Sequence, residues 1–339
     1  MINTQLILLE GLSGSGKSFT SQLLTMQLQR NEHLAEWVYE EQVPHPVYNR
    51  QQLDQMIAIA LCRHRLDNGQ ATIWDRLKLF SYKAPCCYQK ALDHWQKLVA
   101  QTRLNGNVLV MDGGFFQTPL LTLLAMESSD EKMLAYSLEV AKIIAPLNPI
   151  VIHLYQDDVA QAINDNFSRR GDEFRHYIQD RIRLTPFANS RSALKIDQVT
   201  LEFFQHYMQI INHISRQLPL AIKEINNSDG DWQRCNAMIA GFLEIPVLQE
   251  SCQPLNPLSD LAGRYQLAGK SDDVFNIIIE NEGLTLTSPS RLRLFHKQDN
   301  LFCVEGTLNE CCFVKDQDNK VTQLNYKMPG IQTVELIKL

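Results

Sequence analysis

The sequence predicts an α/β chain in which a three-layer domain built on a parallel sheet is followed by a small, all-β antiparallel domain. The chain has 339 residues, which is more than one compact domain usually contains. Before about residue 250, apolar strand-like runs alternate with long stretches of helical periodicity, which is typical of α/β layers. After that point, strand-like runs follow one another with turn residues between them.

Composition and charge exclude several classes of protein. Hydrophobic residues make up 45% and charged residues 21% of the chain, which is typical of a globular protein. No apolar run approaches about 18 residues and no basic segment opens the chain, so we expect neither a membrane partner nor a secretory signal. The net charge of −6 gives no reason to expect a nucleic-acid partner. The eight cysteines form no C-x-x-C pattern, so we expect reduced thiols and a cytoplasmic location.

Five strands are predicted in the first domain, and four of them are continuous apolar runs, as expected of parallel strands buried on both faces. These five strands cover residues 5–10, 36–40, 108–112, 150–155 and 220–225. The long segment between the second and third strands is mostly helical in period, with helices expected over residues 51–65 and 88–103. A short run over residues 71–74 is the alternative third strand. We favour 108–112 because it is the longer run and has a more normal spacing to the fourth strand.

A proline-containing segment is predicted to separate the two domains. Residues 251–257 contain Pro254 and Pro257, which indicates a linker between domains at residues 1–250 and 258–339. A hairpin turn is expected at Asn281-Glu282-Gly283. The strands of the second domain are predicted over residues 274–280, 284–287, 291–297, 301–305, 311–315, 321–328 and 333–338. A chain of this length suffices for a small barrel or a sandwich.

The strongest functional signal is a complete G-x-x-x-x-G-K-S motif with an apolar strand before it and a helical pattern after it. Its glycines let backbone amides wrap a phosphate chain, and the helix N-terminus adds positive potential. Lys17 can reach the β- and γ-phosphates, and the Ser18 hydroxyl can ligate Mg²⁺. A glycine-rich turn without a ligand is the competing interpretation, which the flanking elements disfavour. We therefore predict binding of ATP and Mg²⁺ by Gly11, Ser13, Gly14, Ser15, Gly16, Lys17, Ser18 and Phe19.

Acids at two strand ends are candidates for the chemistry, because phosphoryl transfer depends mainly on positioning and charge neutralisation. Asp112 ends the third strand beside the loop, where an acid can hold Mg²⁺ together with Ser18. The competing interpretation of Asp112 is a turn residue or a helix cap. Glu40 or Glu41, at the end of the second strand, is the candidate to orient an acceptor hydroxyl or to take its proton.

Arginines after the fourth strand are candidates for a cation that arrives when the site closes. Residues 158–170 have helical spacing and end in Arg169 and Arg170, and Gly171 then offers a hinge for a lid. We predict that Arg169 or Arg170 touches phosphate. A solvated helix face is the competing interpretation of such a cluster.

These features make the first domain resemble P-loop kinases of the thymidylate kinase-like and deoxynucleoside kinase-like group. The resemblance rests on Glu10 directly before the loop, on the acids that end the second and third strands, and on Arg169-Arg170. It spans residues 1 to about 245. It implies the fold of a P-loop NTPase, with the five parallel strands in the order 2-3-1-4-5.

Two further points narrow and qualify this resemblance. The segments that contain His45-Pro46, 112–117 and 147–152 resemble a group of uncharacterised bacterial thymidylate-kinase-like proteins. However, the kinases usually carry Asp-Arg at the end of the third strand, whereas Gly113 follows Asp112 here. An Asp75-Arg76 pair exists after residues 71–74, so the alternative third strand and the acceptor specificity both stay open.

The second domain opens with residues 261–265, Leu-Ala-Gly-Arg-Tyr, which resemble the start of the small β domain appended to some bacterial serine hydrolases. The domain has no G-x-S-x-G nucleophile motif. We therefore interpret it as a docking, ligand-sensing or oligomerising module, which makes a homo-oligomer possible.

Together these patterns predict a Mg²⁺- and ATP-dependent phosphotransferase. Its partners would be a nucleoside triphosphate and an unidentified small acceptor: a nucleoside, a nucleotide or another hydroxyl compound. One alternative is a regulatory switch or ATPase in which nucleotide changes the contact with the β domain. Another is a degenerate module that binds nucleotide without turnover.

Overall fold

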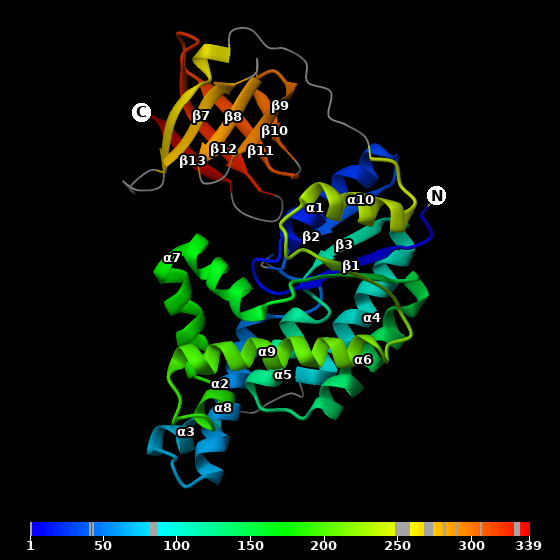
Figure 1. Cartoon of the computed structure of the whole chain (residues 1–339), viewed down its shortest axis with the longest axis vertical. Coiled ribbons are helices and arrows are strands. Elements are labelled where there is room, and N and C mark those ends of the chain that lie inside the picture. Colours follow the sequence, from blue (N-terminus) through cyan, green and yellow to red (C-terminus); the bar gives the residue numbers. More distant parts are fainter. Residues whose placement is uncertain are drawn as a thin grey trace.

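The computed structural model describes residues 2–40, 42, 44–81, 87–247, 258–267, 274–280, 283–288, 291–305, 307–328 and 333–339. The predicted linker at 251–257, the turn residues Asn281 and Glu282, and Glu41 lie outside the described residues. The linker and the domain boundaries therefore stay predictions. A parallel sheet and a closed antiparallel barrel form the two parts of the structure (Figure 1).

The parallel sheet has five strands in the order β2-β3-β1-β4-β5, as predicted. The strands are β1 (Leu6–Gly11), β2 (Ala35–Val38), β3 (Val108–Asp112), β4 (Ile150–Tyr155) and β5 (Ala221–Asn226). Every residue of β1 and β3 is buried, because helices cover both faces of the sheet. The alternative third strand does not form: residues 71–74 lead into helix α3 (Ile73–Ser81), so Asp75-Arg76 lies on a helix.

Helices pack on both sides of this sheet (Figure 1). One face is covered by α1 (Lys17–Arg30) and α10 (Trp232–Leu243). The other helices are α2 (Arg50–Asp67), α4 (Cys87–Asn105), α5 (Gln117–Ala125), α6 (Asp130–Ile144), α7 (Val159–Arg183), α8 (Pro186–Asn189) and α9 (Ile196–Ser215). In the described part of the chain, no helix combines the length and the apolar character that a bilayer crossing requires.

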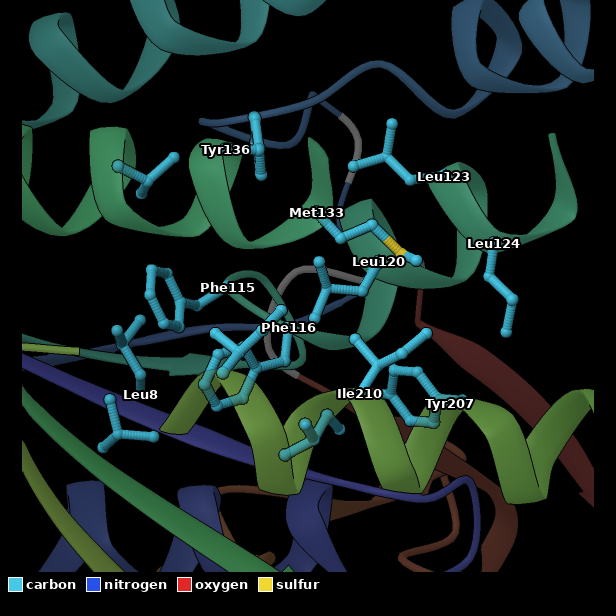
Figure 2. Close-up of a cluster of buried hydrophobic side chains, with 14 of the residues drawn as sticks. Leu8, Phe115, Phe116, Leu120, Leu123, Leu124, Met133, Tyr136, Tyr207 and Ile210 are labelled. Atoms are coloured by element: carbon cyan, nitrogen blue, oxygen red, sulfur yellow. The ribbon is translucent and has the colours of Figure 1, made fainter. Parts of the chain in front are cut away.

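The two cores of this domain follow from the alternation of side chains along β1. Leu6 and Leu8 point into a large core beneath α4, α5, α6 and α9, whereas Ile7 and Leu9 point into a smaller core beneath α1 and α10. Figure 2 shows part of the large core, where Leu8 lies near the Phe115 and Phe116 rings and Tyr207 of α9 lies beside Ile210. Full burial of each such side chain contributes about 1.5–3 kcal/mol. The cores therefore hold the carboxyl ends of β1, β3 and β4 in fixed relation.

Helix α7 consists of two helical halves. The predicted end of the first helical segment at Arg169-Arg170 is confirmed by the break at Gly171, and a second half, which the sequence did not predict, continues to Arg183. At Gly171 the backbone has φ 84° and ψ 174°, so two helical halves meet there at a kink. Glycine tolerates this conformation because it has no Cβ. The start of α7 is fixed by Asp158, whose carboxylate accepts a hydrogen bond of 2.9 Å from the Gln161 amide.

The C-terminal part forms a closed barrel in the order β10-β11-β12-β13-β6-β7-β8-β9, which settles the choice between barrel and sandwich. Its strands are β6 (Gly263–Leu267), β7 (Val274–Glu280), β8 (Gly283–Ser288), β9 (Leu292–Gln298), β10 (Leu301–Val304), β11 (Glu310–Lys315), β12 (Val321–Lys327) and β13 (Val334–Lys338). Tyr265, Phe302 and Phe313 fill the interior. Because the barrel is closed, each of the described barrel strands has a neighbour on both sides.

Candidate functional site

The G-x-x-x-x-G-K-S motif, residues 11–18, forms the phosphate loop. It connects the end of β1 to the start of α1, as the motif requires. Within the loop, the Ser15 amide donates to the Leu12 carbonyl at 3.1 Å. The Lys17 side chain is only 4% exposed, and its Nζ donates to the same Leu12 carbonyl at 2.9 Å. A phosphate chain at this loop would find both the N-terminus of α1 and an ammonium group.

Two glycines of the loop are required by close neighbours. Gly14 has φ 86°, and a Cβ there would lie 2.5 Å from Oδ1 of Asn166 on α7. Gly16 has φ 89°, and a Cβ there would lie 1.8 Å from the Trp232 ring at the start of α10. Any larger residue would have to adopt a positive φ and would displace the Asn166 or Trp232 side chain. The motif alone predicted the glycines, but not the Asn166 and Trp232 contacts that demand them.

The loop after β5 also supports the phosphate loop. The buried Asn227 side chain donates from Nδ2 to the Ser15 carbonyl at 2.8 Å, and its backbone amide donates to Tyr155 at 2.8 Å. The Trp232 ring lies edge-on to Phe19 with ring centroids 6.0 Å apart. Sequence analysis did not identify Asn227. The available signal for Asn227 is its position directly after the fifth strand.

Asp112 is fully buried at the end of β3, and neither carboxylate oxygen has a hydrogen-bond partner in the described part of the chain. Burial raises the pKa of this carboxyl to about 7, while Lys17 and the nearby Ser18 hydroxyl lower it and Glu40 raises it. A buried unpaired carboxylate is costly, and a divalent cation would satisfy it. Asp112 and Ser18 therefore fit a Mg²⁺ ion whose remaining ligands would be phosphate oxygens and water.

The protein itself would supply few ligands to this Mg²⁺ ion. Among the described residues, no group of three or more His, Cys, Asp or Glu side chains is arranged to hold a metal ion. Mg²⁺ needs no such cage, because it keeps several waters and is commonly bound through one or two protein ligands and substrate phosphates.

Glu40 lies just beyond the end of β2 and is brought next to Asp112. Its Oε2 accepts a hydrogen bond of 2.8 Å from Nε2 of Gln117, and it lies 2.9 Å from the position that a Cβ on Gly113 would occupy. The Tyr48 hydroxyl donates to the Glu40 carbonyl at 2.6 Å. The structure thus brings together Glu40, Asp112 and Lys17 from three separate elements. Glu41 lies outside the described residues.

Glu10, on which the resemblance to P-loop kinases partly rests, lies beside the predicted site residues. Its buried carboxylate accepts hydrogen bonds from the backbone amides of Phe115 at 2.7 Å and Gln117 at 3.0 Å. Burial raises its pKa to about 7, although these amides and Lys17 lower it. Glu10 therefore fixes the turn between Asp112 and α5. An acid directly before the phosphate loop is the signal that points to it.

The two arginines of α7 have different surroundings. Arg169 donates from Nη2 to the Gly14 carbonyl at 3.2 Å and from Nε to the Asp165 carbonyl at 3.4 Å. The Arg170 guanidinium instead lies 3.6 Å above the Phe174 ring centroid. Arg169 thus reaches the phosphate loop, whereas Arg170 packs along its own helix.

A half-buried histidine and a fully buried one lie near the phosphate loop and its acids, and both are held neutral. His45 stacks on Tyr48 with centroids 3.7 Å apart, and burial lowers its pKa to about 3. His153 is fully buried on β4 next to Glu10 in register, and burial together with Lys17 lowers its pKa to about 4. Neither ring adds a positive charge near the loop at neutral pH.

The chain matches no family model and no curated protein. Among solved structures, a tRNA isopentenylpyrophosphate transferase from Bacillus halodurans is 13% identical, with 71% of this chain and 97% of that chain covered and a TM-score of 0.33. The thymidine kinase EHV4-TK complexed with TP4A is 13% identical, with 74% and 94% covered and a TM-score of 0.35. A GTPase in apo form from Pyrococcus abyssi is 9% identical, with 72% and 99% covered and a TM-score of 0.26. Likeness at this level assigns this chain neither a family nor an activity.

Proposed function

We propose that this protein is a Mg²⁺- and ATP-dependent phosphotransferase that acts on a nucleoside, a nucleotide or another small hydroxyl compound. The observation that supports this most directly is Asp112. It is a fully buried carboxylate without a hydrogen-bond partner in the described residues, and it lies beside Lys17 and Ser18 of a complete phosphate loop. A bound metal ion would compensate the negative charge of this carboxylate.

The phosphate loop and the acids beside it would bind ATP, the phosphate donor. Lys17, which now donates to the Leu12 carbonyl, would instead bind the β- and γ-phosphates. Ser18 and Asp112 would hold Mg²⁺, and the ion would neutralise part of the charge on the phosphates. Glu10 would act indirectly, because its hydrogen bonds to Phe115 and Gln117 hold the turn that follows Asp112.

Glu40 would act on the molecule that accepts the phosphate. A carboxylate within reach of the acceptor hydroxyl can orient it and accept its proton as the bond to phosphorus forms. Gln117 already holds one oxygen of Glu40, so the other oxygen is left for the acceptor. Arg169 would exchange the Gly14 carbonyl for the oxygens of the transferred group, which gain charge during transfer.

An acceptor screen tests this proposal. The full chain is incubated with ATP and Mg²⁺ and with nucleosides, nucleotides, sugars and small antibiotics in turn, and ADP is measured. We expect ADP formation that depends on one class of acceptor and on Mg²⁺. Calorimetry in which neither ATP nor GTP binds in the presence of Mg²⁺ would defeat the proposal.

One contact favours a second candidate, the nucleotide-dependent switch. The backbone amide of Leu308 in the barrel donates to Oε1 of Gln22 on α1 at 3.2 Å. Because α1 begins at Lys17, a change in the loop can reach the barrel through this helix. Steady ATP turnover without any acceptor, with altered amide-exchange protection in the barrel, would favour the switch over the phosphotransferase.

A further inference from the structure

A groove runs between α1 and α10 on the face of the sheet that these two helices share. It has a volume of about 340 Å³. Figure 1 shows the two helices on the same side of the sheet. Leu24, Ile239 and Ala240 belong to the smaller core and also line the groove, so the groove reaches down to that core. Its volume falls within the range of small-molecule sites.

The chemistry of the lining is neutral throughout. Apolar side chains form most of it, and Thr20, Gln27, Gln233 and Asn236 supply its polar groups. No Asp, Glu, Lys or Arg is found among the described residues that line the groove. A ligand that carries phosphate or carboxylate would therefore lose its hydration without gaining a counter-charge. The lining suits an uncharged, mainly apolar molecule with a few hydrogen-bonding groups.

Polar groups that a ligand can reach lie on the α10 wall of the groove. Gln233 is exposed and Asn236 is half-buried, and both line the groove. Thr20 lines the groove from α1, but its hydroxyl oxygen is itself buried. A ligand in the groove would therefore take its hydrogen bonds from Gln233 and Asn236.

We propose that the groove between α1 and α10 is a binding site for an uncharged, mainly apolar small molecule, separate from the phosphate-transfer site. The two sites are neighbours along the chain, since Thr20 follows Ser18 by two residues and Gln233 follows Trp232. Their chemistry differs, because the phosphate loop offers an ammonium and helix-terminal amides whereas the groove offers apolar walls and neutral polar groups.

The test uses the neutral fluorescent probe N-phenyl-1-naphthylamine with the full chain. We expect saturable binding with a rise in probe fluorescence. Ala237→Phe places a ring in the groove from α10, and Leu23→Phe does so from α1. Each should weaken probe binding at least about tenfold, a change of 1.4 kcal/mol. The matched control is Ala58→Phe on α2, an exposed helical alanine away from the groove, which should bind as the wild type does.

Three results would overturn the site: no saturable binding, equal binding in all three variants, or displacement of the probe by ATP. Displacement would make the groove the base end of the nucleotide site. Calorimetry with ATP on the same proteins separates this outcome from the proposed activity. If the wild type does not bind ATP, the proposed phosphotransferase activity is wrong. The probe measurements still decide whether the groove is a binding site.

Discussion

Lys17 lies close to two buried carboxyl groups, and its ammonium lowers the pKa of both Glu10 and Asp112. The same ammonium is the cation that the phosphate loop offers to a triphosphate. We expect Lys17→Ala to lower ADP formation at least about 100-fold, because loss of one preorganised electrostatic contact typically has this effect. The measurement is ADP release with saturating ATP, together with far-UV circular dichroism to confirm folding.

A matched control for this change is Lys132→Ala on α6, since Lys132 is exposed there. It should retain wild-type turnover. Full activity in Lys17→Ala would contradict the assignment of the loop.

At Asp112 the relevant quantity is the affinity for Mg²⁺. Asp112→Asn removes the charge while keeping the shape, so it should raise the Mg²⁺ concentration needed for half-maximal turnover about tenfold or more. The measurement is a Mg²⁺ titration at fixed ATP. Asp67→Asn, at the exposed end of α2, is the control that should leave the titration unchanged. Identical Mg²⁺ curves for both variants would remove Asp112 from the metal site.

At the scale of a single element, α7 places two adjacent arginines in different roles. Arg169→Ala removes the contact to the Gly14 carbonyl and should lower kcat at least about tenfold while changing nucleotide affinity less. Arg170→Ala removes the stack on Phe174, so it serves as the neighbouring control, with a stability loss of about 0.5–1 kcal/mol. Steady-state kinetics and ATP calorimetry measure both. Equal kcat values in both variants and the wild type would rule out a lid arginine.

The kink in α7 makes a second prediction for this element. Gly171 has φ 84°, and no atom lies within 4 Å of a Cβ built there, so any cost of Gly171→Ala comes from the backbone. We expect a loss of about 1–3 kcal/mol in the free energy of unfolding, measured with urea.

Gly241 supplies the contrast to Gly171. It lies inside α10, and its Cβ position is also open, but it has no positive φ. Gly241→Ala should therefore stabilise the protein by about 0.5–1 kcal/mol. Destabilisation of similar size in both variants would mean that Gly171 needs no special backbone conformation.

For the whole molecule, two buried carboxyls couple stability to pH. Burial raises the pKa of Glu10 from 4.5 and of Asp112 from 3.8 to about 7 in each case. The folded state therefore holds these protons more tightly than the unfolded state does. Their contribution to stability is complete below the unfolded values and is lost as pH rises through about 7. Urea unfolding without Mg²⁺ should show lower stability at pH 8 than at pH 5.

Glu10→Gln tests the origin of this slope. The variant lacks one of the two groups, so its stability should change less between pH 5 and pH 8 than that of the wild type. Added Mg²⁺ should restore stability at pH 8 in both proteins by binding Asp112. A slope that is the same in Glu10→Gln and the wild type would place the pH dependence elsewhere.

The strands of the parallel sheet were predicted well because each is indicated by a pattern within its own few residues. Strands β3 and β4 have the predicted bounds, and the other three strands of the sheet shift by one or two residues. A continuous apolar run needs only its own residues to show that both faces are buried. The glycine after Arg170 was also a local signal, because Gly171 marks the kink where the first half of α7 ends.

Sequence by itself thus determined the five strands, the loop between Gly11 and Ser18, and the change to consecutive strands after about residue 250. The tertiary structure alone decided that the barrel closes through pairing of β6 with β13, that Arg169 rather than Arg170 touches the loop, and that Asn227 supports Ser15. The reason is physical. Periodicity and glycine placement reflect sterics and burial within a few residues, whereas these contacts join residues that only the packing of distant elements brings together.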